Sequence, residues 1–223
     1  MRMSRIAAGI LAGALLWACV VCARWGLADL AIADVMGLEA QVVDRLARTG
    51  VGATPQEAEA LFGTLKFAQQ LDPANPAVAE HFGQLHFLGL VSAAPNDSGH
   101  TSTLTPYLRA VRLRPTSGYA WANFAWAKYH LGQVDQEFYR ALKAAMRMGP
   151  WEPEVQYVVL DLGLALWDEM PAELRPMTLG IAQNARRRFE SRVLEIAQRR
   201  GRVAALCLSE GFAGLVACNT RPR

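Results

Sequence analysis

The sequence predicts an all-α protein, a row of helical hairpins behind an N-terminal transmembrane helix. Three observations predict this fold class. Past residue 25, apolar residues recur with helical spacing, and hardly any alternating stretch is long enough for a strand. Pairs of one large and one small residue recur at a nearly constant spacing. Residues 6–23 carry no charge, and a run of about 18 residues reaches the lower limit for crossing a hydrocarbon core.

The leader, residues 1–25, favours an uncleaved signal anchor over a cleaved signal peptide. Its apolar run from Ile6 to Ala23 exceeds the roughly 7 to 15 residues of a cleaved segment, although small residues near its end offer a cleavage site. Arg2 and Arg5 precede the run and Arg24 follows it closely, so the charge bias predicts a cytoplasmic N-terminus. We therefore expect a single-pass protein with its C-terminal domain outside the cytoplasm, which in a bacterium means an inner-membrane anchor and a periplasmic domain.

The elements after the leader follow from periodicity and from Gly and Pro stops. Residues 26–52 predict a juxtamembrane helix and a linker, because helical spacing ends at Gly50-Val51-Gly52. Residues 53–200 predict the helical domain, and residues 201–223 a C-terminal tail. Within the domain we expect helices over 56–73, 76–90, 105–115, two within 118–150, one over 153–170 and further helix over 171–197, with a polar insertion at 92–103.

The best-preserved hairpin runs from Gly118 to Pro150. Gly132 separates its two helices, and Gly149-Pro150 ends the second. Phe82-Gly83 and Leu162-Gly163 are the large-small pairs of the neighbouring copies. A small residue beside a large one lets two helix backbones approach closely, and no single hairpin can bury its own apolar face.

This arrangement resembles the tetratricopeptide repeat superfamily over roughly residues 55–170, with degenerate copies. A closer similarity covers most of the mature chain. The run RPTSGYAWANFAWAKYHLGQVDQEFYRALKAAMRMGPWEPEVQ, then DLGLALWDEM and a C-terminal pair of cysteines, resembles the VpsP-type proteins found among bacterial exopolysaccharide biosynthesis genes. That resemblance implies a non-catalytic scaffold in the periplasm, whose partners are other components of a polysaccharide assembly or export complex. The alternative is a periplasmic module that binds the polysaccharide itself.

The register of such a repeat predicts a binding groove on the first helix of each hairpin. The groove would be an aromatic strip with polar ends, formed by Glu80, Gln84, Tyr119, Trp126, Tyr129, His130, Tyr157 and Trp167. Aromatic faces beside hydrogen-bonding groups suit a sugar chain or an extended peptide. In the alternative interpretation, Trp126, Tyr129 and Trp167 pack against the following helix.

The four cysteines form two pairs with different meanings. Cys19 and Cys22 lie inside the apolar run, where metal or redox chemistry has no polar support, and Trp17 disfavours a lipobox ending at Cys19. In an oxidising compartment, Cys207 and Cys218 predict a disulfide that staples the tail. Two buried free thiols are the alternative for this second pair.

Charge and motifs give no case for catalysis. Lys and Arg number 23 against 20 for Asp and Glu, so the chain gives no case for a nucleic-acid partner. The four histidines lack metal-binding spacing, no cofactor motif is present, and no pair of acids can be assigned to a glycosidase. The basic run Arg186 to Arg188 predicts a solvated helix face, with contact to anionic lipid or an acidic polymer as the alternative. We expect a protein that is not an enzyme.

Overall fold

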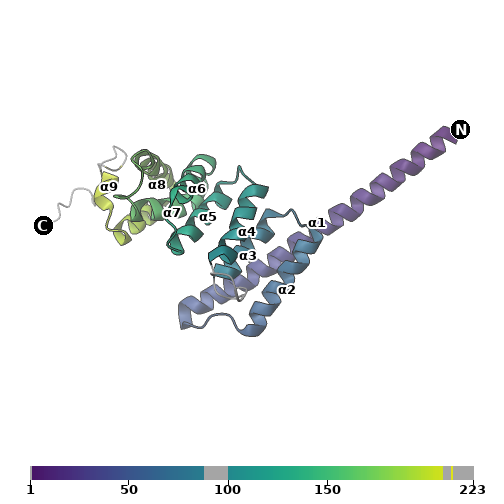
Figure 1. The fold of residues 1–223 in the computed structure, drawn as a ribbon, viewed down its shortest axis with the longest axis horizontal. Helices are drawn as coiled ribbons and strands as arrows, with labels where there is room; N and C mark the ends of the chain where they lie inside the picture. Colours follow the sequence, from purple (N-terminus) through teal and green to yellow (C-terminus); the bar gives the residue numbers. More distant parts are fainter. Residues whose placement is uncertain (1, 88–99, 208–211, 213–223) are drawn as a thin grey trace. The chain divides into compact units, whose positions relative to one another are not determined.

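The computed structural model describes residues 2–87, 100–207 and 212, and every regular element among them is an α-helix (Figure 1). The prediction of an all-α protein with a long apolar N-terminal helix is therefore confirmed. The expected hairpin helices are present with small shifts in their ends. Two boundaries were wrong: the helix predicted from residue 105 begins at His100 and includes part of the expected polar insertion, and the helix predicted over 153–170 ends at Ala165.

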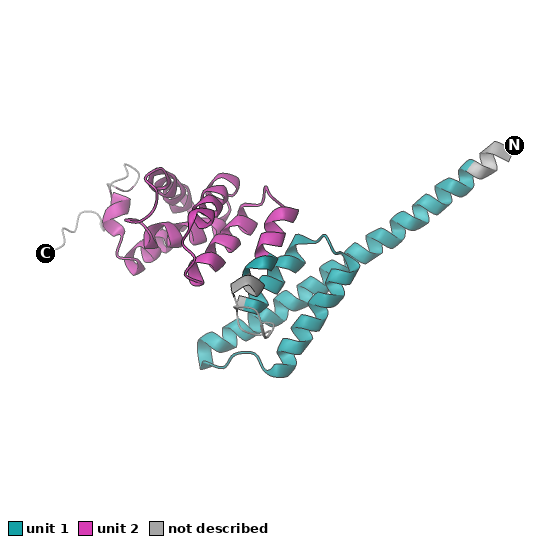
Figure 2. Ribbon diagram, viewed as in Figure 1, with its two compact units in different colours: residues 1–106 teal, residues 107–223 magenta. Residues whose placement is uncertain are grey.

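The chain divides into two compact units, residues 1–106 and 107–223 (Figure 2). This division differs from the predicted scheme, in which residues 53–200 form one domain. The first unit contains α1 (Arg2–Thr49), α2 (Pro55–Leu71) and α3 (Pro76–Phe87). The second contains α5 (Gly118–His130), α6 (Gln136–Met148), α7 (Pro153–Ala165), α8 (Leu174–Arg199) and α9 (Val203–Cys207), while α4 (His100–Leu113) crosses the boundary.

Helix α1 has two parts in different environments. Its apolar part from Ala7 to Ala23 is almost entirely exposed, including Leu16 and Trp17, each at 71%. The helix is long and apolar enough to cross a membrane, although a signal sequence near an N-terminus has the same features. From Ala28 onward one residue every three or four is buried, which is the pattern of a helix packed on one face. Gly50, with φ of 71°, ends the helix in the left-handed conformation that glycine favours.

The packed part of α1 forms the core of the first unit together with α2 and α3. Buried side chains from all three helices meet in two adjoining clusters, which consist of Ala31, Ile32, Ala68 and Val78, and of Val35, Leu61, Leu65 and Leu85. Polar contacts begin directly after the apolar part, where Arg24 donates a 3.0 Å hydrogen bond to the carbonyl of Gln70 at the end of α2. The segment predicted as juxtamembrane is therefore an integral helix of this unit.

The connection between α1 and α2 is fixed by a capping box and an ion pair. The Thr54 hydroxyl accepts from the backbone N–H of Glu57, and the Glu57 carboxylate accepts from the backbone N–H of Thr54 at 2.7 Å. Arg45 of α1 donates to both oxygens of that carboxylate, at 2.9 and 2.6 Å. The Arg45 hydrogen bond, with help from the backbone of Thr54, lowers the pKa of Glu57 to about 2.

The second unit contains α5 and α6, which follow each other as the two helices predicted within 118–150. Ser117 caps α5, Asp135 caps α6, and Gly132 turns between them with φ of 71°. The two helix ends are in backbone contact, because a Cβ atom on Gly118 would lie only 2.5 Å from the Cα of Gly149. Position 118 therefore requires glycine, and the helix stop predicted at Gly149 agrees with the end of α6 at Met148.

Helices α7 and α8 form the next packed pair. A Cβ atom on Gly163 of α7 would lie 2.8 Å from the Thr178 side chain of α8, which is fully buried. Helix α8 is kinked at Phe189, where φ is −138° and ψ is 43°. Gly201, with φ of 65°, follows the end of α8, as the sequence indicated.

Candidate functional site

The predicted groove residues lie in both units. Tyr119, Trp126, Tyr129 and His130 are on α5, Tyr157 is on α7, and Trp167 follows α7; Glu80 and Gln84 are on α3 of the first unit. Tyr119 and His130 are exposed, Glu80 is buried, and the remaining members are partly buried.

Three of these rings are in contact with one another. The ring centroids of Trp126 and His130 are 4.4 Å apart, and those of Tyr129 and His130 are 5.3 Å apart with the rings nearly perpendicular. Tyr129 also lies 6.5 Å from Phe138 of α6. Such contacts with the following helix are those of the packing interpretation, so the groove stays a prediction.

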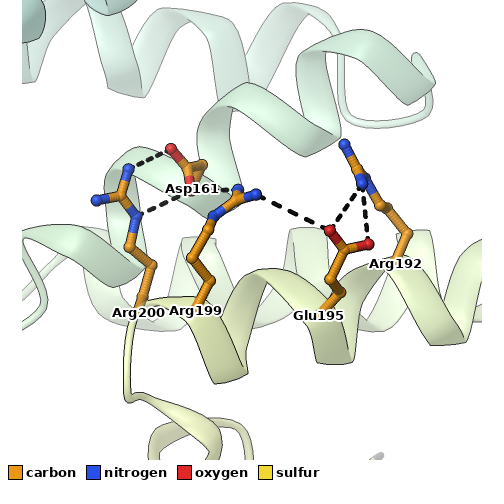
Figure 3. A network of polar contacts seen from close by, with 5 residues as sticks. All are labelled: Asp161, Arg192, Glu195, Arg199 and Arg200. Carbon is orange, nitrogen blue, oxygen red and sulfur yellow. Dashed lines mark hydrogen bonds and ion pairs between the residues drawn. The ribbon is translucent and has the colours of Figure 1, made fainter. Parts of the chain in front are cut away.

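Beside these rings, Asp161 of α7 is held by two arginines at the end of α8 (Figure 3). Its Oδ1 accepts a hydrogen bond from Arg199 and another from Arg200, both at 2.9 Å, and Arg200 also donates to Oδ2. Arg192 donates to Glu195 at 3.0 and 2.9 Å, and Glu195 lies 4.0 Å from Arg199. The network joins α7 to the last turns of α8.

The charges of this network lower the pKa of Asp161, and the pKa of the nearby His130 is lowered as well. Burial alone would raise the pKa of Asp161, but the hydrogen bonds from Arg200 and Arg199 outweigh burial and lower it. Burial also lowers the pKa of His130, and the positive charge of Arg200 adds to that effect against the opposing influence of Asp161. A carboxylate held by two arginines in this way joins α7 to the end of α8.

A separate pocket of about 250 Å³ lies beside the kink of α8. Three parts of the chain form it: the loop before α7, the first turn of α7, and α8 on both sides of residue 188. Its lining consists of Trp151, Gln156, Asn184, Arg187, Arg188 and Phe189. Gln156 positions the loop that carries Trp151, because its Nε2 donates a 2.8 Å hydrogen bond to the carbonyl of Pro150.

The pocket contains two arginines without a countercharge. Among the described residues, Arg187 and Arg188 form no hydrogen bond or ion pair, and no carboxylate is part of the lining. The other arginines in and just after the second half of α8 are paired: Arg186 with Glu190, Arg192 with Glu195, Arg199 and Arg200 with Asp161, and Arg202 with Asp168.

The sequence pointed to only part of this pocket. The run Arg186 to Arg188 stood out, but its three members have different roles, since Arg186 is paired and stacks 5.2 Å from the ring of Phe212. Trp151, Gln156, Asn184 and Phe189 were missed. The one available signal was Trp151 itself, an aromatic residue placed directly after a helix stop and 62% exposed.

The cysteines and the histidines give no further site. Cys19 and Cys22 are free and exposed on α1. Cys207 ends α9, whereas Cys218 lies outside the described residues, so their disulfide stays a prediction. Within the described part of the chain, no three His, Cys, Asp or Glu residues are grouped in a way that would hold a metal ion.

Comparison with known proteins adds no relative. The chain matches no protein-family model and no curated protein. The resemblance to tetratricopeptide repeats and to VpsP-type proteins is therefore a hypothesis that rests on the residues quoted above.

Proposed function

We propose that this protein is a non-catalytic scaffold of bacterial exopolysaccharide biosynthesis or export, anchored in the inner membrane and acting through protein–protein contacts in the periplasm. The observation that carries the proposal is α1, in which an exposed apolar segment continues directly into a helix of the first packed unit. Such a helix holds a folded unit at a membrane surface, where components of an assembly complex meet.

A tetratricopeptide-like arrangement of the helices is the second argument for the scaffold role. Helices α5 with α6, and α7 with α8, are packed neighbours in the chain, and α5 also packs against α7. Gly118 and Gly163 lie at close helix contacts, which is the role that the repeat assigns to its small residues. Repeats of this kind present extended surfaces to protein partners. The exopolysaccharide context comes from the VpsP-type resemblance.

The test is a pull-down of the full-length, tagged protein from native membranes after mild crosslinking. We expect integral components of a polysaccharide synthase or exporter among the co-purifying proteins, and loss of polymer output when the gene is deleted. A matched control carries Arg192→Gln, which alters one exposed ion pair of α8 and should leave both results unchanged. Recovery of the protein from the soluble periplasm, shortened at its N-terminus, would contradict the anchor, and unchanged polymer output would contradict the scaffold.

A second candidate function is a periplasmic glycan-binding module. The contact between the Trp126, Tyr129 and His130 rings favours it, because adjacent partly exposed rings offer faces for sugars. Trp126→Ala and Trp167→Ala separate the possibilities. Preserved helicity with lost polymer output supports a groove, whereas loss of folding shows that these rings are packing residues.

A further inference from the structure

The pocket beside the kink of α8 has the composition of a ligand site. We propose that it binds one acidic sugar residue, a pyranose ring that carries a carboxylate. This inference is independent of the scaffold role, since the pocket lies within the second unit and direct binding tests it.

The charge of the ligand follows from Arg187 and Arg188. Both residues line the pocket and are exposed, and within the described residues neither has a carboxylate partner, whereas their neighbours in α8 do. A guanidinium presents a planar fork of donors that matches a carboxylate, and such charge-assisted hydrogen bonds are about twice as strong as neutral ones. Two exposed arginines that line one pocket, without a carboxylate partner among the described residues, therefore favour an anionic ligand.

The remainder of the ligand follows from the rings and the amides. Trp151 and Phe189 supply apolar ring surfaces, which suit the C–H faces of a sugar ring. Gln156 and Asn184 supply amide groups, which can donate to hydroxyls and accept from them. The side-chain amide of Asn184 forms no hydrogen bond with a described residue, so it is available to a ligand. Rings, amides and cations together recognise a ring that has hydroxyls and a carboxylate.

The volume restricts the ligand to one ring. The pocket measures about 250 Å³, and sites for drug-sized ligands measure roughly 300 to 1,000 Å³. A single pyranose unit of a polymer fits this size better than a nucleotide, which adds a base and phosphates to its sugar. A lipid headgroup lies in a flat surface and is attracted by basic residues alone. It would therefore need neither the rings of Trp151 and Phe189 nor the pocket.

The experiment measures binding of trigalacturonate to the full-length protein by calorimetry. The protein is kept in a polyoxyethylene detergent, because glycoside detergents carry sugars of their own. Galactotriose, which has the same rings without carboxylates, is the matched neutral probe. We expect trigalacturonate to bind and galactotriose to bind at least about tenfold more weakly, as the loss of charged hydrogen bonds predicts.

Variants then assign the binding to this pocket. Arg187→Gln combined with Arg188→Gln should weaken trigalacturonate binding at least about tenfold, while Arg192→Gln, which removes a paired cation outside the pocket, should leave it unchanged. Trp151→Ala is a second variant that should weaken binding without unfolding, since Trp151 is 62% exposed. Circular dichroism checks the folding of each variant.

Three results would overturn the proposal. The first is that the protein binds trigalacturonate and galactotriose with equal affinity. The second is that both the double variant and Trp151→Ala bind trigalacturonate as tightly as the wild type. The third is that the wild-type protein does not bind trigalacturonate. Vesicles containing phosphatidylglycerol form the remaining arm. Vesicle binding that depends on Arg187 and Arg188, together with no saccharide binding, would assign the two arginines to the membrane.

Discussion

The close contact between Gly163 and Thr178 predicts that the effect of Gly163→Ala on the free energy of unfolding depends on residue 178. With threonine there, the substitution should bring a loss or no gain in stability, and with alanine there it should bring a gain. In Gly163→Ala, the new Cβ atom would lie 2.8 Å from both Cγ2 and Oγ1 of Thr178. Thr178 is fully buried, and its hydroxyl donates a 2.9 Å hydrogen bond to the carbonyl of Leu174, so it cannot rotate away freely. Overpacking of this kind costs about 1–3 kcal/mol, which exceeds or cancels the gain of about 1 kcal/mol from replacing a helical glycine by alanine.

Thr178→Ala removes both clashing atoms. The remaining Cβ atom of residue 178 lies 3.4 Å from the new Cβ atom on residue 163, which is an ordinary contact. In this background Gly163→Ala should therefore stabilise the protein by about 1 kcal/mol, the full difference in helix propensity. The double-mutant cycle should give a coupling free energy of about 1–3 kcal/mol.

The assay is urea unfolding of the full-length protein in non-ionic detergent, followed by tryptophan fluorescence. Gly180→Ala is the matched control, since it replaces a glycine within α8 whose Cβ position has no atom within 4 Å. It should stabilise the protein by about 1 kcal/mol in either background. If Gly163→Ala has the same effect with threonine and with alanine at residue 178, the proposed close contact between α7 and α8 does not exist.

Three further predictions concern helix contacts and ion pairs. Gly118→Ala should destabilise the protein by at least about 1–3 kcal/mol in the urea assay, because its Cβ atom would meet backbone atoms of Gly149 at 2.5 Å; a stabilising effect would contradict that contact. Burial opposes the charge of Lys128, but Glu137 and Asp135 outweigh burial and raise its pKa above the ordinary 10.5. Its ion pairs therefore stabilise fully below pH 10.5 and are lost as pH rises through the folded-state pKa, so Lys128→Met should flatten the alkaline decline of stability, and an unchanged decline would refute this. The pKa of Glu57 is lowered from 4.5 to about 2, so its contribution is present above pH 4.5 and is lost as pH falls towards 2; Glu57→Gln should reduce this acid-dependent loss, as measured by acid titration of helicity, and an identical acid curve would argue against the Arg45 contact.

Local signals in the sequence predicted the helices and several of their ends. Helix stops such as Gly132 and Gly201 need positive φ, which is a property of the residue itself, so periodicity and glycine placement were sufficient there. The apolar run of α1 could also be recognised from the sequence, because its length and composition alone make it a candidate membrane span.

The sequence could not show features that depend on a partner from another helix. The buried Lys128 is neutralised by Asp135 and Glu137 from the following turn and helix, which no periodicity specifies. The kink at Phe189 has no proline or glycine to mark it, and the pocket exists only where that kink meets the loop before α7. The unpaired arginines therefore could not be told from the paired Arg186 by composition.

The unbroken course of α1 gives the first unit a fixed angular setting relative to its apolar segment. Arg24 contacts the end of α2 directly after that segment, so the described residues leave no flexible joint between the two parts. Each residue of an α-helix turns about 100° and rises about 1.5 Å. Inserting one alanine after Ala23 would swing the first unit by about 100° around the helix axis, whereas inserting about seven would restore its direction some 10 Å further along that axis from the apolar segment. With the proposed membrane anchor, a partner held in the same membrane would lose its docking face in the first variant and regain it in the second.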